Sequence, residues 1–258
     1  MKAKEVSLYI QNWLSEYLQN TGLTGFVVGI SGGIDSAVVS KLCALTGKPT
    51  IIMTMPIRQT KAEYDRAWKH MRTLKSEFSN VEIIEIDLSS TFKIFEEQMP
   101  FDLTKNHLAM ANSRSRLRMT TLYAIAQANN SLVVGTGNKV EDFGVGFYTK
   151  YGDGGVDISP IADLNKTQVF ELGRFIGIIE DILIAKPTDG LFEDGRSDED
   201  QIGATYPELE WAMEFEGDES KLSAREVEVL RIYRRLNKIN QHKMQPIPVC
   251  LMPKEFVA

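Results

Sequence analysis

The sequence has little cysteine, because only Cys43 and Cys250 occur, far apart and without CxxC or Cys/His spacing. This argues against a disulfide framework, a structural zinc site and chemistry by a cysteine pair. Long hydrophobic runs are also lacking, so we expect no membrane-spanning helix, no membrane partner and no signal peptide. Since nothing in the sequence directs the chain elsewhere, we expect a cytoplasmic protein.

Positively charged residues are fewer than negatively charged ones. The 258 residues include 29 lysines and arginines against 35 aspartates and glutamates, for a net charge of −6. A nucleic-acid partner is therefore not expected, although local phosphate binding depends on a site and not on this total. The apolar fraction of 43% is typical of a globular protein, and no linker composition divides the chain. We therefore expect one domain over residues 1–258.

Short apolar runs alternate with longer helical patterns along the chain. Continuous β-branched runs bounded by turn residues are typical of strands buried on both faces, as in a parallel sheet with helical crossovers. The predicted fold is α/β, a doubly wound and mostly parallel sheet with helices on both faces. We expect strands at 26–30, 50–56, 81–87 and 131–136, and helices near the N-terminus and at 35–45, 61–78, 106–129 and 223–240.

The stretch GISGGIDS, residues 29–36, lies between the first expected strand and the first expected crossover helix. Successive backbone N–H groups in such a glycine-rich turn form a concave set of donors that suits phosphate. Gly32 and Gly33 permit close approach of phosphate oxygens, and Ser31 and Ser36 add hydroxyl donors. The stretch matches neither the GxxxxGK[ST] pattern nor the GxGxxG pattern.

Asp35 is unusual in a phosphate site, because its carboxylate would repel the ligand. A Mg²⁺ ion between Asp35 and a phosphate oxygen would remove the conflict, since Mg²⁺ commonly binds one or two carboxylates together with substrate phosphates. Alternatively, Asp35 caps the following helix. The residues by themselves leave both interpretations open.

The string SGGIDS resembles the SGGxDS signature of the ATP pyrophosphatases, or PP-loop enzymes, whose fold is called adenine nucleotide alpha-hydrolase-like. Further motifs closely resemble ammonia-dependent NAD synthetase, in the same order and over nearly the whole chain. They are GTGNKVEDFGVGFYTKYGDGGVD at 135–157, SPIADLNK at 159–166, KPTDGLFEDGRSDEDQIG at 186–203, and the pair His242-Lys243.

This resemblance implies a set of site residues. Asp35, Glu141 and Lys166 would be catalytic, and Asp35 and Glu141 would bind Mg²⁺. The resemblance places contacts to ATP at Gly29, Ile30, Ser31, Gly32, Gly33, Ile34, Asp35, Ser36, Gln59, Thr136, Lys166 and Thr188. It places contacts to deamido-NAD at Arg116, Lys150, Asp157, His242 and Lys243.

The resemblance also implies a reaction. The nicotinate carboxylate of deamido-NAD would be adenylated by ATP, and ammonia would then replace AMP to give NAD. Free ammonia is the expected donor, because 258 residues leave no room for an added amidase domain. A homodimer is implied as well, and we expect residues 186–201 to form a mobile lid. The alternatives are another PP-loop adenylating enzyme, such as a tRNA-modifying one, and a non-catalytic ATP-sensing module.

Three features depart from the family pattern. Gly137 and Asn138 stand where the family often has Asp-His, and the segment 141–147 is one residue longer than in some relatives. The family's PTADL string is PTDGL here, at 187–191. None of these changes removes an expected metal ligand or phosphate contact.

Overall fold

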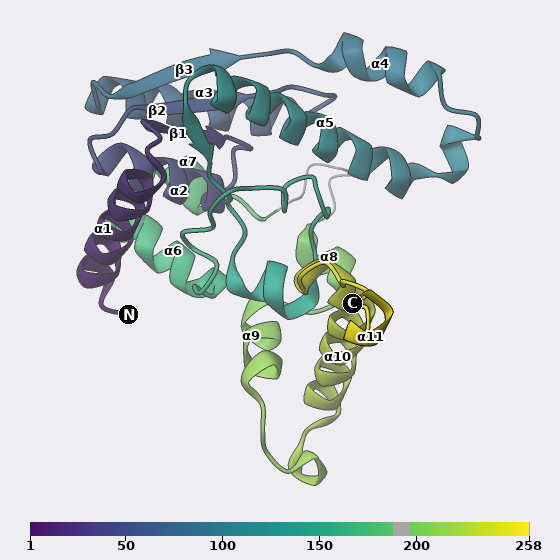
Figure 1. Cartoon of the computed structure of the whole chain (residues 1–258). Coiled ribbons are helices and arrows are strands. Elements are labelled where there is room, and N and C mark those ends of the chain that lie inside the picture. The colour runs from purple at the N-terminus through teal and green to yellow at the C-terminus, as the bar shows by residue number, and fades with distance from the viewer. Residues whose placement is uncertain (188–196, 258) are drawn as a thin grey trace.

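Four parallel strands form the centre of the molecule (Figure 1). The computed structural model describes residues 1–187 and 197–257. Its sheet has the order β3-β2-β1-β4. The α/β fold predicted from the alternating pattern is therefore confirmed. The strands are β1 (Gly25–Gly29), β2 (Thr50–Thr54), β3 (Val81–Glu85) and β4 (Ser131–Val133).

The strand order reverses beside β1. The chain runs from β1 outward through β2 to β3 and then returns to pair β4 with the other edge of β1. Val27 is therefore paired with Ile51 on one side and with Val133 on the other. Open α/β sheets bind ligands where the order reverses, outside the carboxyl ends of the strands. Here that point is the end of β1 and β4.

The fourth strand is shorter than the predicted 131–136. After Val133 the backbone turns to a different partner, since Val134 forms a parallel bridge with Ile158 and Gly135 N–H donates to the Ile158 carbonyl at 2.7 Å. The segment around 156–158 thus extends the sheet edge. The apolar run in the sequence does not distinguish these two kinds of pairing.

Helices cover both faces of the sheet, because alternate strand residues point to opposite sides. Val28 and Ile52 pack with one set of helices, whereas Val27 and Met53 pack with the other. The first set is α1 (Ala3–Thr21), α2 (Ile34–Leu45), α3 (Lys61–Glu77), α6 (Lys166–Phe175) and α7 (Glu180–Leu183). The second set is α4 (Ser89–Glu97) and α5 (His107–Ala128), with a 3₁₀ turn, Leu103–Lys105, between them.

A helical arm extends from this body (Figure 1). It has a small apolar core of its own, in which Leu209 and Val229 are buried together with Val140 and Val145 of a π-helical turn, Lys139–Val145. A capping box of Ser223 and Glu226 starts its longest helix. The arm consists of α8 (Asp198–Ile202), α9 (Tyr206–Glu214), a 3₁₀ turn (Glu219–Lys221) and α10 (Ala224–Met244), and α11 (Lys254–Val257) follows near the C-terminus.

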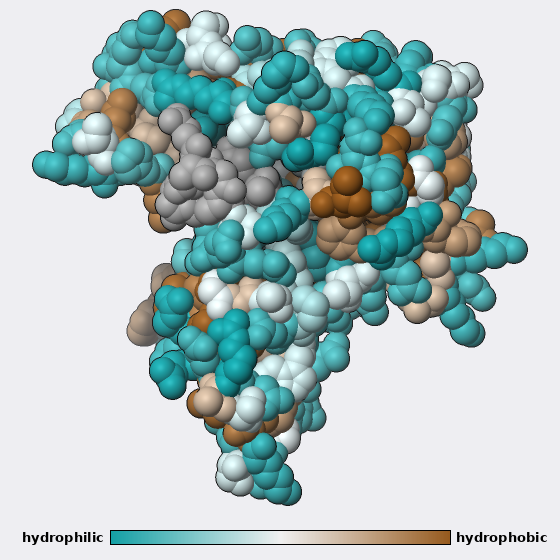
Figure 2. Space-filling view, turned by 180° about the vertical axis from the view of Figure 1, so that it is seen from behind, coloured by the Kyte–Doolittle hydropathy of each residue, from teal (hydrophilic) through white to brown (hydrophobic). Residues whose placement is uncertain are grey.

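Seen from behind, the surface is largely hydrophilic, and hydrophobic residues form small separate patches (Figure 2). Among residues 1–187 and 197–257, no helix has both the length and the apolar composition needed to cross a bilayer. Residues 188–196 of the predicted lid lie outside the described part of the chain. From Ser197 onward the predicted loop is helical instead, because Ser197 and Asp200 form a capping box for α8.

His70 is a buried polar residue between α2 and α3. Its side chain is 1% exposed, and its Nε2 lies 2.9 Å from Ser40 Oγ. Burial, together with the charge of Lys41, lowers the pKa of His70 from 6.5 to about 4. Between these values the folded chain stays neutral at this position while the unfolded chain takes up a proton. Stability is therefore lost as the pH falls through 6.5 toward 4.

We expect this histidine to account for about 2 kcal/mol of the free energy of unfolding lost between pH 7.5 and pH 5. His70→Gln keeps a hydrogen-bonding side chain but removes the titrating group. The free energy of unfolding of this variant should therefore fall by about 2 kcal/mol less than that of the wild type between pH 7.5 and pH 5. Urea unfolding at the two pH values measures it. As a control, His107→Gln at an exposed position should not alter the change of unfolding free energy with pH. An unchanged slope in His70→Gln would contradict the assignment.

Candidate active site

Two carboxylates and one ammonium group meet at the carboxyl edge of β1 and β4. Asp35 lies in the first turn of α2, Glu141 in the π-helical turn that follows β4, and Lys166 at the start of α6. Lys166 Nζ lies 2.5 Å from Asp35 Oδ2 and 2.8 Å from Glu141 Oε1. Residues far apart in the sequence thus converge where the topology predicts a ligand. We call these three residues the charged trio.

The trio is strongly shielded from water, with Lys166 3% exposed. Burial by itself would lower the pKa of the Lys166 ammonium, but Asp35 and Glu141 outweigh this effect and raise it. Burial raises the pKa of Asp35, Lys166 opposes that shift and Glu141 adds to it. A cation is also disfavoured at a helix N-terminus, so the position of Lys166 depends on the two carboxylates.

The turn before α2 has the form of a phosphate cradle. Ser31 Oγ lies 3.1 Å from Ser36 Oγ and accepts from Gly33 N–H at 3.2 Å. Gly32 has φ = +90°, and a Cβ there would lie 2.5 Å from the Glu63 carbonyl oxygen, so only glycine fits. The first N–H groups of α2 have no partner within the helix and point out of its N-terminus. The cradle therefore adjoins Asp35.

Asn138 connects the two acids of the trio. Its side chain is fully buried; Nδ2 donates to Asp35 Oδ1 at 3.2 Å, and Oδ1 accepts from the Glu141 backbone N–H at 3.1 Å. The sequence singled out Asn138 only as a departure from the family pattern. A polar residue three positions before Glu141 is nevertheless a helix-cap signal, and this signal could have indicated its role.

Gly137, the other departure, makes room for a further carboxylate. A Cβ on Gly137 would lie 1.9 Å from Asp142 Oδ2. Burial, followed by the charges of Asp153 and Glu141, raises the pKa of Asp142 well above its usual value. Asp142 therefore occupies the space that a side chain at position 137 would otherwise take.

Tyr206, at the start of α9, contacts the trio from the arm, and sequence analysis did not identify it. Its hydroxyl donates to Glu141 Oε1 and lies 3.1 Å from Asp198 Oδ2. Lys166 Nζ lies over its ring, 4.9 Å from the centroid. Burial, then Glu141 and Asp198, raises the pKa of Tyr206. No local pattern marks this tyrosine, because every one of these contacts is long-range or comes from the short helix α8.

Comparison with known proteins assigns the site to a family, because the family model described as NAD synthase matches residues 6–247. The chain belongs to the NAD synthase family. It is 40% identical over 248 residues to the NH(3)-dependent NAD(+) synthetase of Alkaliphilus metalliredigens, covering 92% of this chain and 94% of the relative. The relative of the same name from Sulfolobus acidocaldarius is 37% identical, covering 93% and 87%.

Solved structures agree with this family. NMN synthetase from Francisella tularensis superposes with a TM-score of 0.85 at 34% identity, covering 98% of this chain and 99% of that one. NH3-dependent NAD synthetase from Campylobacter jejuni, in complex with the nitrate ion, gives 0.78 at 25% identity, covering 98% and 100%. The family resemblance inferred from the motifs is thus confirmed.

Hydrogen bonds link four of the residues expected at the second substrate to one another or to the same loop. Arg116 Nε donates to the Lys150 carbonyl at 3.2 Å, and Lys150 Nζ donates to the His242 carbonyl. Lys243 Nζ donates to the carbonyls of Gly146 and Tyr148, each at 2.8 Å. These contacts join the end of α10 to the loop that follows the π-helical turn.

Asp157 is placed differently from those cations. Its Oδ2 accepts from Val133 N–H at 2.8 Å and its Oδ1 from the Tyr123 hydroxyl at 3.0 Å. These bonds tie the carboxylate to β4 and α5 in this structure. Its expected role at the substrate stays a prediction.

Gln59 and Thr136, expected at ATP, lie after β2 and β4 and are half-buried. Gln59 Oε1 is buried and has no hydrogen-bond partner among the described residues. Buried polar atoms are almost always satisfied, so this oxygen is available to a ligand donor. Thr188 lies outside the described residues.

The donor set of the trio suits Mg²⁺, although no cluster of three or more His, Cys, Asp or Glu side chains able to hold a metal occurs in the described part of the chain. Asp35 and Glu141 direct oxygens at the single point where the Lys166 ammonium lies. Mg²⁺ is commonly held by one or two carboxylates, with phosphate oxygens and water completing its shell. Two acids beside a phosphate cradle meet that requirement.

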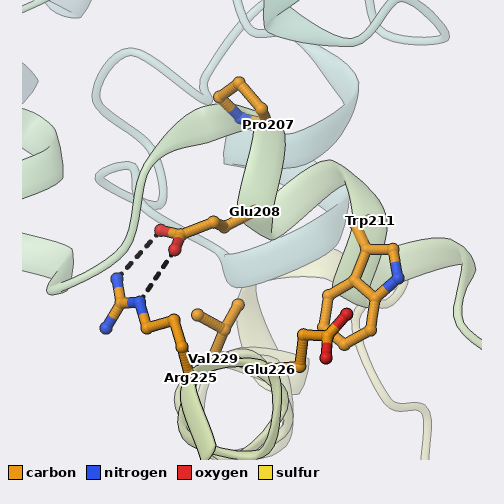
Figure 3. Close-up of a pocket in the computed structure, with 6 residues that line it drawn as sticks. All are labelled: Pro207, Glu208, Trp211, Arg225, Glu226 and Val229. Carbon is orange, nitrogen blue, oxygen red and sulfur yellow. Dashed lines mark hydrogen bonds and ion pairs between the residues drawn. The ribbon is translucent and has the colours of Figure 1, made fainter. Parts of the chain in front are cut away.

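A separate hollow lies on the arm, between α9 and α10 (Figure 3). Arg225 and Glu208 form a two-pronged ion pair across it, at 2.8 and 2.9 Å. The hollow includes none of the expected site residues, and its charged groups have other partners, because Glu226 accepts from Ser223 in the helix cap while Arg225 and Glu208 pair with each other. Its lining consists of Pro207, Glu208, Trp211, Arg225, Glu226 and Val229.

Removing the central cation tests the trio. Lys166→Met keeps the length of the side chain but leaves two carboxylates facing each other, which should cost about 3 kcal/mol of unfolding free energy. Added Mg²⁺ should raise the melting temperature of this variant by more than that of the wild type. Lys41→Met removes a comparably buried lysine, paired with Glu77 at 2.8 Å, and should gain nothing from Mg²⁺. Equal responses of the two variants would contradict the proposed metal site.

The space at Gly137 gives a second test. Gly137→Ala should destabilise the protein by about 2 kcal/mol, because the new methyl group displaces the Asp142 carboxylate. In an Asp142→Ala background the same change should cost almost nothing. A double-mutant cycle by urea unfolding measures this, and additive effects of the two substitutions would show that they do not share one space.

Proposed function

We propose that this member of the NAD synthase family is an ammonia-dependent NAD synthetase, which converts deamido-NAD, ATP and ammonia to NAD, AMP and pyrophosphate. The observation that carries the proposal is the trio of Asp35, Glu141 and Lys166 beside the phosphate cradle. Such a site binds a nucleoside triphosphate and offsets charge on its phosphates. The two relatives named above bear the same activity in their names.

The chemistry requires activation of a carboxylate, since its oxygen is a poor leaving group. An oxygen of the nicotinate carboxylate attacks the α-phosphorus of ATP, and the bond to the bridging oxygen breaks to release pyrophosphate. Ammonia then attacks the acyl carbon, AMP leaves with the electron pair of the broken C–O bond, and the nitrogen loses a proton to solvent. NAD and AMP are the products of this second step.

The chain's own groups contribute positioning and charge. The cradle of residues 29–36 binds the phosphates through backbone N–H and serine hydroxyl groups. Lys166 offsets negative charge that grows as pyrophosphate departs. Mg²⁺, held by Asp35 and Glu141, would supply further charge neutralisation at the phosphates. Asn138 keeps the two acids at a fixed separation, so the site needs little rearrangement before reaction.

The cations near the end of α10 support a phosphate-bearing second substrate. Arg116, Lys150, His242 and Lys243 come from three segments and lie close to one another. A second candidate product follows from the similar structure named NMN synthetase. The same cations would bind the single phosphate of nicotinate mononucleotide, so the size of the second substrate has to be tested directly.

We also propose that the protein is a cytoplasmic homodimer, with ATP as co-substrate and Mg²⁺ as metal, and that residues 1–258 act as one domain. The acidic net charge of −6 supports small-molecule substrates over a nucleic-acid partner. The apolar side chains exposed along the tail, including Leu251 and Phe256, support an additional protein contact there.

We expect purified protein to form AMP, pyrophosphate and NAD from ATP, Mg²⁺, ammonium and deamido-NAD. Asp35→Asn and Glu141→Gln should each lower kcat/KM about 100-fold, because each removes charge that stabilises the transition state. Asp163→Asn removes an exposed acid that pairs with Lys139 at 3.2 Å and should leave the rate unchanged. Chromatographic quantification of all three products provides the measurement.

The remaining outcomes separate the alternatives. A higher kcat/KM with nicotinate mononucleotide would favour NMN as the product. AMP and pyrophosphate without a pyridine nucleotide product would indicate another adenylating enzyme. Folded protein that binds ATP without cleaving it would indicate a non-catalytic sensor and refute the proposed function.

A further inference from the structure

Tyr206 belongs to the arm and touches two members of the trio, Glu141 of the π-helical turn and Lys166 at the start of α6. Its hydroxyl contacts Glu141, and its ring lies beneath the Lys166 ammonium. An ammonium group over an aromatic face is attracted by the negative charge density of the ring, and more strongly where water is excluded. Tyr206 is 4% exposed. A buried side chain of the arm thus contacts the active site directly.

Residues of the arm contact both the backbone N–H and the hydroxyl of Tyr206. The Tyr206 backbone N–H donates to Glu199 Oε1 at 2.8 Å, and the hydroxyl lies 3.1 Å from Asp198 Oδ2. Both acids belong to α8, and the ring packs in the apolar core of the arm with Leu209 and Val229. The position of Tyr206 is therefore fixed by α8 and by the core of the arm, while its hydroxyl points at Glu141.

The hydroxyl carries a single proton but lies against two carboxylates, Glu141 and Asp198. A proton donated to Glu141 places that carboxylate at a defined point and leaves its charge in place. Asp198 Oδ2 lies 3.1 Å from the same hydroxyl oxygen and competes with Glu141 for its one proton. Asp198 is 6% exposed, so this arrangement is shielded from solvent.

We propose that Tyr206 is a positioning residue, anchored to α8 through its backbone N–H, which holds Glu141 and Lys166 at their working separation. The proposal rests on the function proposed above. It assigns the arm a part in the reaction, because α8 and α9 fix the geometry of a charged site whose members come from α2, the π-helical turn and α6. Tyr206 need not touch substrate for this role.

The test separates the hydroxyl from the ring. Tyr206→Phe keeps the ring under Lys166 and should lower kcat about tenfold, with less than a twofold change in KM for ATP. Asp198→Asn leaves the bond from the hydroxyl to Glu141 in place, so it should change kcat less than Tyr206→Phe does, and in the Tyr206→Phe background it should have no further effect. Tyr233→Phe removes a hydroxyl from the same apolar core and should behave as wild type. A merely structural role would instead give additive losses, or a loss in Tyr233→Phe as well.

A stability measurement keeps this proposal distinct from the proposed function. In a double-mutant cycle of Tyr206→Phe with Glu141→Gln, urea unfolding should show clear coupling between the two positions. If the wild-type protein shows no turnover, the proposed function is refuted. The double-mutant cycle would still show whether the Tyr206 hydroxyl and Glu141 interact. Absence of coupling, or an unchanged kcat in Tyr206→Phe, would overturn the proposal.

Discussion

The convergence of Asp35 and Glu141 on the Lys166 ammonium is the interaction on which the rest of the site depends. A buried lysine at a helix N-terminus is unfavourable, and two carboxylates in the same shielded space repel each other. Each cost is offset only when all three groups are present. The turn before α2, the π-helical turn and the start of α6 must therefore adopt fixed relative positions. That requirement explains why Asn138 is buried between two of these segments.

The parts of the site that could be predicted are those with a local pattern. The string from Gly29 to Ser36 indicated both the strand end and the phosphate cradle, because a glycine-rich turn before a helix has few other uses. Glu141 and Lys166 were found through family motifs, and the structure places both beside Asp35. Continuous apolar runs located the four strands to within a few residues, since strands of a buried parallel sheet are apolar on both faces.

The parts that could not be predicted depend on contacts between distant segments. Tyr206 looks like any aromatic residue at a helix start, and only the folded chain shows its hydroxyl at Glu141. The partners of Asp157 likewise come from β4 and α5, and no spacing in the sequence indicates them. The arm was not anticipated as a separate packing unit, because its small core combines residues of the π-helical turn with residues of α8, α9 and α10.

The strand order has a consequence for how the protein forms during synthesis. β1 receives its second neighbour only when β4 emerges, and Thr24 bonds to Asn130, 106 positions later in the chain. Pairing across such a separation requires closure of a long loop and is slow. A growing chain can thus complete the glycine-rich turn before α2 early, whereas Lys166 and Tyr206 are synthesised later. The nascent protein therefore passes through a stage in which one edge of β1 is paired with β2 and the other edge has no partner strand.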